Sequence, residues 1–201
     1  MHIRTYMITA VALLLMAPAA AIANSLIAAN APVRIANSTL SVTPSQDWNK
    51  LSARPGRSAE TWTLDGDALN NLTYYAGIQS DRPLFREVDR RNRPLPRFSA
   101  TMLLADIPTL LENSYRAGRS VAVYAIEQVE PVQFAGQSGV HFRYSFTAGD
   151  EVRRRGEAYG AIVSGCLYLV TYEAPAIHYF DASIEAFRQV IASAAIGSGR
   201  R

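Results

Sequence analysis

The stretch that most constrains the fold is 139–194, where three apolar segments follow one another with only short turns between them. In the first segment the apolar residues alternate strictly with polar ones; they are Val140, Phe142, Tyr144 and Phe146. Strict alternation predicts a strand with one buried face. Gly149-Asp150 and Ser164-Gly165 separate the segments and favour hairpin turns, because Gly and Asp tolerate positive φ. We therefore expect strands over 139–148, 151–163 and 166–174.

The last of these strands and the segment after it indicate how the sheet is covered. Around Leu169 and Val170 the strand has no polar side, which is typical of a central strand covered on both faces. Beyond it, four apolar residues recur at helical spacing; they are Phe180, Ile184, Phe187 and Ile191. We expect a helix that ends near Ala194, with Asp181 as its N-cap. Antiparallel strands covered by such a helix predict a layered α+β domain.

The preceding part of the chain predicts more strands and a second helix. Alternating patterns indicate strands over 38–43, 60–64, 72–79 and 121–134. Apolar spacing and Pro108 indicate a helix that begins at Asp106 or Ile107 and stops at Gly118. A turn over 136–139 is expected before the strand that follows.

An acidic triplet, Asp65-Gly66-Asp67, raises the question of a calcium site. A calcium-binding loop of the EF-hand type needs Gly at its sixth position and Glu at its twelfth, where this chain has Asn70 and Ala76. The triplet is therefore expected to be a plain turn. The mature chain also offers only His141, His178 and Cys166 as nitrogen or sulfur ligands, so no metal site is expected.

The N-terminus has the pattern of a secretory signal peptide over residues 1–23. Arg4 precedes an apolar run, Pro18 interrupts it, and Ala21 and Ala23 supply the small residues that a signal peptidase needs. The alternative is an uncleaved anchor, although the run is short for a span of about 20 residues. We expect a flexible lead-in over 24–37, one domain over 38–196 and a disordered tail over 197–201, with no transmembrane segment after cleavage and a periplasmic or secreted location.

Composition and charge exclude some classes of protein. The hydrophobic fraction of 49% and the charged fraction of 18% are those of an ordinary globular protein. The net charge of +3 is too small to indicate a nucleic-acid partner. Cys166 is the only cysteine, so an intrachain disulfide is excluded, and we expect this thiol to be a small buried hydrophobic group.

Several short motifs together resemble a known superfamily. They are Asp-Trp-Asn at 47–49, Gly-x-x-Gly-Val-x-Phe-x-Tyr-x-Phe at 136–146, Arg-Arg-Arg-Gly-Glu at 153–157, Leu-Tyr-Leu-Val-Thr-Tyr-Glu-Ala at 167–174, and a final helix ending Val-Ile-x-Ser at 190–193. The sequence resembles the Mog1/PsbP-like superfamily, in particular its small exported bacterial members. The resemblance implies an α/β/α sandwich on a mainly antiparallel sheet. Known members bind protein partners rather than catalyse reactions, and no functional residue carries over.

One polar group on the predicted sheet is a candidate for catalysis. His141 and Arg143 lie on one strand, Glu157 and Tyr159 on the next, and Tyr172 and Glu173 on the third; the candidate catalytic residues are His141, Glu157 and Tyr172. A histidine beside a carboxylate has the composition of a general base. The alternative is a solvated sheet face, or structural ion pairs beneath a covering segment. At the start of the last helix, His178 is expected to cap or pack rather than to bind a metal.

A second candidate site lies in the long segment 80–97, which contains six arginines, three acids and three prolines. Long ordered loops often carry function. Arg86, Arg90, Arg91 and Arg93 are the candidates for binding an anion such as a phosphate, a lipid headgroup or a glycan carboxylate. The alternative is a solvated loop whose ion pairs contribute little.

These observations favour an exported, non-catalytic binding or accessory factor of the periplasm or cell envelope, without a cofactor and with an envelope protein as a candidate partner. Two alternatives stay open. One is a periplasmic hydrolase that uses the polar face around His141. The other is an envelope module that binds anionic lipid or glycan through the arginine-rich segment 82–97. The oligomeric state is not indicated by the sequence.

Overall fold

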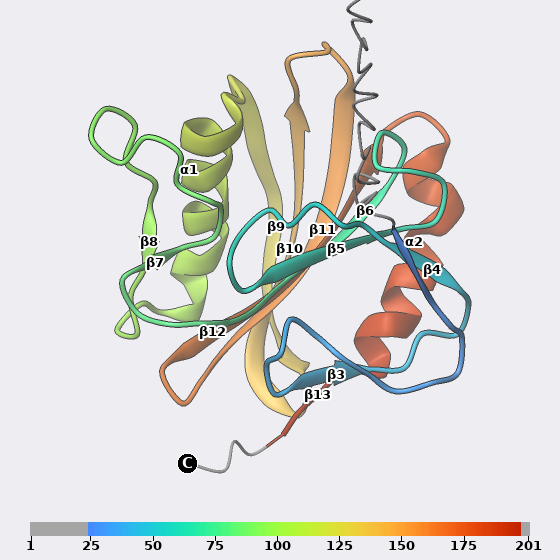
Figure 1. The fold of residues 1–201 in the computed structure, drawn as a ribbon. Helices are drawn as coiled ribbons and strands as arrows, with labels where there is room; N and C mark the ends of the chain where they lie inside the picture. Colours follow the sequence, from blue (N-terminus) through green and yellow to red (C-terminus); the bar gives the residue numbers. More distant parts are fainter. Residues whose placement is uncertain (1–23, 198–201) are drawn as a thin grey trace, which may run out of the picture.

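The computed structural model describes residues 24–197, which form an eight-stranded antiparallel sheet with a helix on each side (Figure 1). The strands are, in spatial order, β1 (Ser25–Ile27), β4 (Trp48–Lys50), β5 (Ala59–Thr63), β6 (Asn71–Ile78), β12 (Cys166–Pro175), β11 (Arg153–Val163), β10 (Gln137–Thr147) and β9 (Val123–Phe134). Helix α1 (Ile107–Arg119) covers one face, and helix α2 (Tyr179–Ala192) covers the other. The expected α/β/α sandwich on an antiparallel sheet is confirmed.

Two small sheets complete the fold. β13 (Ala195–Ile196), β3 (Leu40–Val42) and β2 (Val33–Arg34) form one of them, beside α2. β7 (Arg82–Pro83) and β8 (Arg97–Phe98) form the other, on the side of α1 (Figure 1). A short 3₁₀ helix, η1 (Leu104–Asp106), leads into α1.

Hairpins join the four long strands β9, β10, β11 and β12 in sequence order. Ala135-Gly136 and Ser164-Gly165 both have positive φ at their two residues, between 51° and 75°, as two-residue hairpin turns require. The turn before β10 is therefore shorter than expected, because Gln137 already pairs with Phe134.

The two faces of the sheet carry separate cores. β12 contributes to both, since Leu169 packs toward α1 and Val170 toward α2, and both are fully buried. This confirms the prediction of a central strand covered on both faces. Trp48 is also fully buried, in the core beneath α2, where its ring lies 6.5 Å from that of Trp62.

The segment 24–37 is part of the folded domain rather than a separate lead-in. β1 pairs with β4 at the edge of the large sheet, and β2 pairs with β3. At the other end, the amide of Gly197 donates to the carbonyl of Thr39 at 3.0 Å. The expected signal peptide (1–23) and residues 198–201 of the expected tail lie outside the described residues. Within 24–197, none of the helices is both long enough and apolar enough to span a membrane.

Three local expectations are corrected. Gly118 lies inside α1, which ends at Arg119; a Cβ at Gly118 would stand 2.8 Å from the Phe85 ring, so close packing explains this glycine. Asp181 is not the N-cap of α2, because His178 holds that position and Asp181 accepts from Arg155 at 2.9 Å instead. Cys166 is partly exposed rather than buried.

The acidic triplet is a turn, as expected. Gly66 has a φ of 109°, which few other residues adopt. The side-chain oxygen of Asn70 accepts from the amide of Leu64 and from the hydroxyl of Thr63, each at 2.8 Å. The Asn70 side chain therefore stabilises the turn through hydrogen bonds to the residues that precede it.

Candidate functional site

The segment 80–97 folds over one end of the sheet and encloses a hollow of about 500 Å³, which we call the arginine groove. Its walls come from β6, β7, β8 and the loop before β5, and five arginines line it: Arg57, Arg82, Arg86, Arg90 and Arg97. Glu87 is the one acidic side chain among the lining residues. The groove therefore combines the volume of a small-ligand site with a strong positive charge.

Buried apolar residues fix the position of this segment. Leu84, Phe85 and Leu95 are buried and belong to the core beneath α1. The amide of Arg86 donates to the carbonyl of Pro55 at 2.7 Å, which ties the segment to the loop before β5. A Cβ at Gly56 would stand 2.1 Å from the Leu84 carbonyl oxygen, so only glycine permits this approach. The same approach brings Arg57 into the groove.

The single acid of the groove is already paired. Glu87 accepts from Arg97 Nη2 at 2.7 Å and from the amide of Leu95 at 3.2 Å. The hydrogen bond from the Leu95 amide, helped by Arg97, lowers the pKa of Glu87 below its usual range. Glu87 is therefore ionised at neutral pH and neutralises one arginine of the five.

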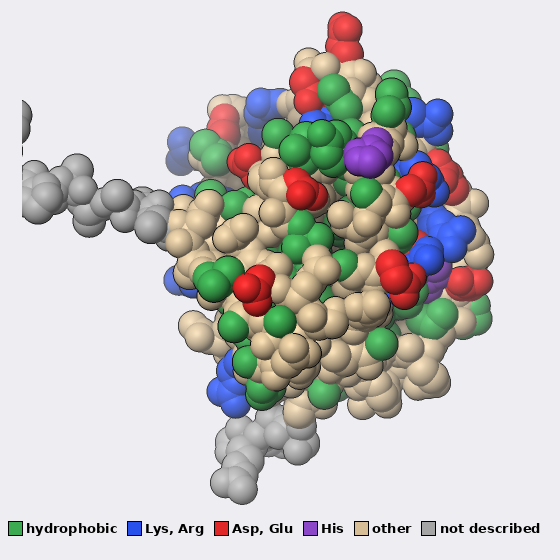
Figure 2. All heavy atoms as spheres, turned by 90° about the vertical axis from the view of Figure 1, so that its right-hand side faces the viewer, with side chains coloured by type: hydrophobic (Ala, Val, Ile, Leu, Met, Phe, Trp, Pro, Cys, Tyr) green, Lys and Arg blue, Asp and Glu red, His purple; other side chains and the backbone are tan. Residues whose placement is uncertain are grey.

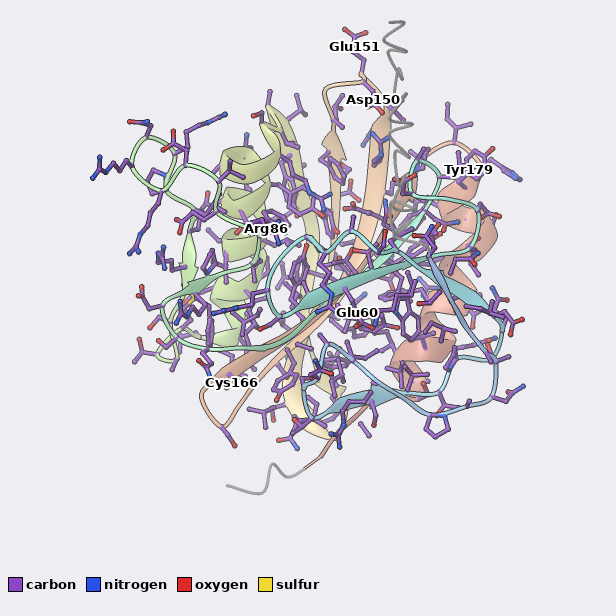
Figure 3. The ribbon with its side chains drawn as sticks, in the orientation of Figure 1. Glu60, Arg86, Asp150, Glu151, Cys166 and Tyr179 are labelled. Carbon is purple, nitrogen blue, oxygen red and sulfur yellow. The ribbon has the colours of Figure 1, made fainter. Side chains whose placement is uncertain are left out.

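The other four arginines of the groove form no ion pair with the part of the chain that the structure describes. Among residues 24–197, no carboxylate lies within 4.0 Å of the side chains of Arg57, Arg82, Arg86 and Arg90. In Figure 3, side chains with nitrogen tips extend outward from the loop that precedes β8. Four like charges around one hollow repel one another, and an anion in the groove would relieve this repulsion.

The structure gathers some of the predicted anion-binding residues and separates others. Arg86 and Arg90 line the groove, whereas Arg91 is exposed outside it and Arg93 donates to the Ser120 hydroxyl at 3.2 Å. The sequence prediction missed three lining residues, Arg57, Arg82 and Arg97. Arg82 and Arg97 lie near the two ends of the segment 80–97, and the high number of arginines in that segment could have indicated them. Arg57 comes from an earlier loop, and no local pattern marks it.

The second candidate group lies on the opposite face, beneath α2, around a buried Glu157. His141 and Glu157 come together as predicted: His141 Nε2 lies 3.3 Å from Glu157 Oε1. Glu157 is 1% exposed and accepts from Arg188 Nε at 3.1 Å and Arg188 Nη2 at 2.9 Å. Arg143 Nε stands 3.5 Å away. The sequence missed Arg188, which reaches the sheet from α2.

A second carboxylate holds the other ring nitrogen of His141. Nδ1 lies 2.6 Å from Glu130 Oε1 on β9, and the ring of Tyr159 covers the imidazole at 4.5 Å between centroids. Burial alone would lower the pKa of His141, but the nearby carboxylates of Glu157 and Glu130 outweigh it and raise that pKa. His141 is 4% exposed. Nδ1 is thus hydrogen-bonded to Glu130, while Nε2 lies at ion-pair distance from Glu157 without a hydrogen bond.

The third predicted catalytic residue does not join this group. Tyr172 pairs in register with Glu157 on the same face, but its hydroxyl donates to the carbonyl of Tyr179 at 3.3 Å. Glu173 points to the opposite face, where Tyr115 donates to it and Arg119 Nη1 donates at 2.9 Å. The polar residues of the three strands therefore form two separate clusters, one on each side of the sheet.

The surface around α2 carries mixed charge. Figure 2 views this side of the molecule, and there positive and negative side chains lie next to each other along one edge. Arg155 pairs with Asp181 at 2.9 Å, and Arg188 with Glu157. This side therefore lacks the one-sided charge of the arginine groove.

Among residues 24–197, no group of three or more His, Cys, Asp or Glu side chains is arranged so that it could hold a metal ion. The His141 group contains one histidine and two carboxylates, but Arg188 and Arg143 occupy the space beside Glu157. The chemistry that this group supports is ion pairing between α2 and the sheet.

Known structures share the fold. No protein-family model matches the sequence, and a search of curated proteins finds no significant match. Cyanobacterial PsbP (CyanoP) from Synechocystis sp. PCC 6803 is similar in structure, with a TM-score of 0.55 and 14% identity, over 91% of this chain and 99% of that one. A protein of unknown function from Pseudomonas aeruginosa, PA94, a putative regulator by its description, gives a TM-score of 0.47 at 10% identity, over 85% and 97% of the two chains.

The class that these observations define is an α/β/α sandwich on an antiparallel sheet. More particularly, the chain has the PsbP-like fold, as its resemblance to the Mog1/PsbP-like superfamily implied. At 14% identity the likeness establishes the fold alone. The function must therefore be argued from the site.

Proposed function

We propose that this protein is an exported, non-catalytic binding factor of the periplasm or cell envelope, and that the arginine groove binds an anionic ligand. One observation carries the proposal: a hollow of about 500 Å³ is surrounded by four arginines that have no carboxylate of residues 24–197 within 4.0 Å. Guanidinium groups bind phosphate and carboxylate oxygens through paired N–H donors. The signal-peptide pattern of residues 1–23 supports an exported location.

The geometry around His141 gives the hydrolase alternative no comparable support. A general base needs a nitrogen within reach of the substrate proton. Both ring nitrogens of His141 face carboxylates of the protein, and the ring is 4% exposed. An envelope protein partner, which the resemblance suggests, stays a prediction that the groove neither requires nor excludes.

Isothermal titration with glycerol phosphate tests the proposal, with neutral glycerol as the ligand control. We expect the phosphate ester to bind and glycerol not to bind. Neutralising Arg86 and Arg90 together (R86Q/R90Q) should weaken binding about 25-fold, since each lost charge-assisted contact at an exposed site costs about a factor of five.

The matched control is Arg153→Gln on β11. Arg153 is 70% exposed, and its nearest carboxylate, that of Glu127, is 3.9 Å away. This variant changes the net charge of the protein without touching the groove, so glycerol phosphate should bind it as it binds the wild type. Equal binding by R86Q/R90Q and wild type would refute the proposed site.

A further inference from the structure

The loop between β7 and β8 presents an apolar tip among its arginines. Val88 is 92% exposed, more than any other large hydrophobic residue that the structure describes. Arg86, Arg90 and Arg91 beside it are also exposed. An exposed apolar side chain surrounded by arginines is suited to a surface that is anionic outside and apolar just beneath.

Both acids of this loop are engaged in hydrogen bonds with the loop itself. Asp89 accepts from the amide of Asn92 at 3.1 Å and from its side chain at 2.8 Å, and the amide of Arg93 donates to the Asp89 carbonyl at 2.9 Å. Glu87 is held by Arg97 and by the Leu95 amide. The exposed arginines and Val88 are therefore the side chains of the tip that are left free to meet a partner, while both acids are held by hydrogen bonds.

Two hollows adjoin this loop. One is the arginine groove; the other has a volume of about 380 Å³, and its lining includes Arg86, Val88, Asp89 and Arg93. Arg86 lines both. Two arginines therefore share the second hollow with Val88 and one acid, an arrangement suited to an interface where phosphate groups lie above an apolar layer.

We propose that this loop docks the protein on an anionic phospholipid membrane, with Val88 entering the interface and a lipid phosphate held in the arginine groove. The inference rests on the proposed function, since it assigns the anionic ligand to a lipid headgroup. The loop is already ordered by the core residues beneath it, so docking requires little rearrangement. A free phosphate ester presents the same phosphate group to the arginines as a lipid headgroup does. It differs from a membrane because it has no apolar layer for Val88 to enter.

Co-sedimentation with lipid vesicles tests the inference. The probes are vesicles of phosphatidylcholine alone and vesicles with one quarter phosphatidylglycerol, at low and moderate salt. We expect binding to the anionic vesicles only, weakening as salt rises. R86Q/R90Q should weaken vesicle binding about 25-fold, at about five-fold per arginine. Val88→Asp should weaken it about ten-fold or more, because an apolar contact is replaced by a charge.

Two control variants match these changes. Ile177→Asp places the same charge at another highly exposed apolar residue, which is 86% exposed beside α2. Arg153→Gln removes an arginine outside the groove. Both should bind anionic vesicles within about two-fold of the wild type. All five positions changed in these four variants are exposed, so circular dichroism should show unchanged folding.

The outcomes separate the two proposals. Binding of glycerol phosphate without binding to anionic vesicles would overturn membrane docking and leave the proposed function in place. If neither glycerol phosphate nor the anionic vesicles bind, both the anion-binding function and membrane docking are overturned. Vesicle binding that V88D and I177D reduce equally would also overturn the inference, since it would show that Val88 does not enter the interface.

Discussion

Replacing Glu157 with glutamine should lower the free energy of unfolding by about 3 kcal/mol. Glu157 is 1% exposed and accepts hydrogen bonds from Arg188, with His141 at 3.3 Å. Glutamine keeps the shape of the side chain and removes its charge. Arg188 and His141 then lose the anion that compensates them, which is the costly way to break a buried ion pair.

The pKa of Glu157 gives the magnitude. Burial alone would raise this pKa, but the nearby His141 and the hydrogen bonds from Arg188 outweigh the burial and lower it from 4.5 to about 2. A difference of about 2.5 between the unfolded and folded pKa corresponds to about 3 kcal/mol of stability when the group is ionised. For a domain of this size, this loss lowers Tm by about 6–12 °C.

The pH dependence follows from the directions of two pKa shifts. The lowered pKa of Glu157 stabilises the fold above about pH 4.5, and this contribution disappears as the pH falls toward 2. The raised pKa of His141 stabilises the fold below about pH 6.5 and ceases to do so once the pH exceeds the folded-state pKa. The difference in stability between wild type and E157Q should therefore be largest between about pH 4.5 and 6.5.

Urea denaturation across pH 3–8 measures this difference. The control is Glu127→Gln, because Glu127 is 43% exposed and its partner Arg153 lies 3.9 Å away; this change should cost less than about 0.5 kcal/mol. A loss below about 1 kcal/mol for E157Q at pH 5.5, or a loss that does not vary with pH, would refute the assignment of a buried ionic link between α2 and the sheet.

Two further changes probe the core beneath α1. Gly156→Ala should destabilise the fold by about 1–3 kcal/mol or more in chemical denaturation, because the new Cβ would stand 2.1 Å from the Tyr144 ring. The control is Gly149→Ala, which has open space around it and should change the free energy of unfolding by no more than about 0.5 kcal/mol. Equal effects of the two substitutions would disprove the packing argument. Tyr115→Phe should cost about 1–3 kcal/mol, because it removes the hydroxyl that donates to the buried Glu173; an unchanged denaturation midpoint would show that this hydrogen bond contributes nothing.

The long strands and α2 could be predicted from local pattern alone. Between Val140 and Phe146 the alternation matches the pleat of β10, and the spacing of Phe180 and Phe187 matches the buried side of α2. Such patterns work because the apolar side chains of each element pack against one core, even where the polar face is also covered, as His141 and Ser145 are on β10. The short strands β1 and β2 carry no such pattern, since pairing with β4 and β3 places them.

The candidate sites were only partly predictable, because their residues meet through the tertiary fold. The register of β10 and β11 brings His141 near Glu157, and alternation was enough to suggest it. Arg188 arrives from a helix packed on that face, and Arg57 from a loop that approaches through Gly56. Neither contact has a local sequence signal. Tyr172 and Glu173 lie on opposite faces of the sheet, because consecutive side chains in a strand point to opposite faces.

The central claim is that the arginines of the groove bind an anion, and arginine side-chain NMR tests it most directly. The Nε–Hε signals of ¹⁵N-labelled protein would be followed during titration with glycerol phosphate and assigned by single Arg→Gln variants. The structure predicts saturable shifts for four arginines, Arg57, Arg82, Arg86 and Arg90, and unchanged signals for Arg153 and Arg155. Shifts of similar size at all arginines, or none at the four, would contradict the account.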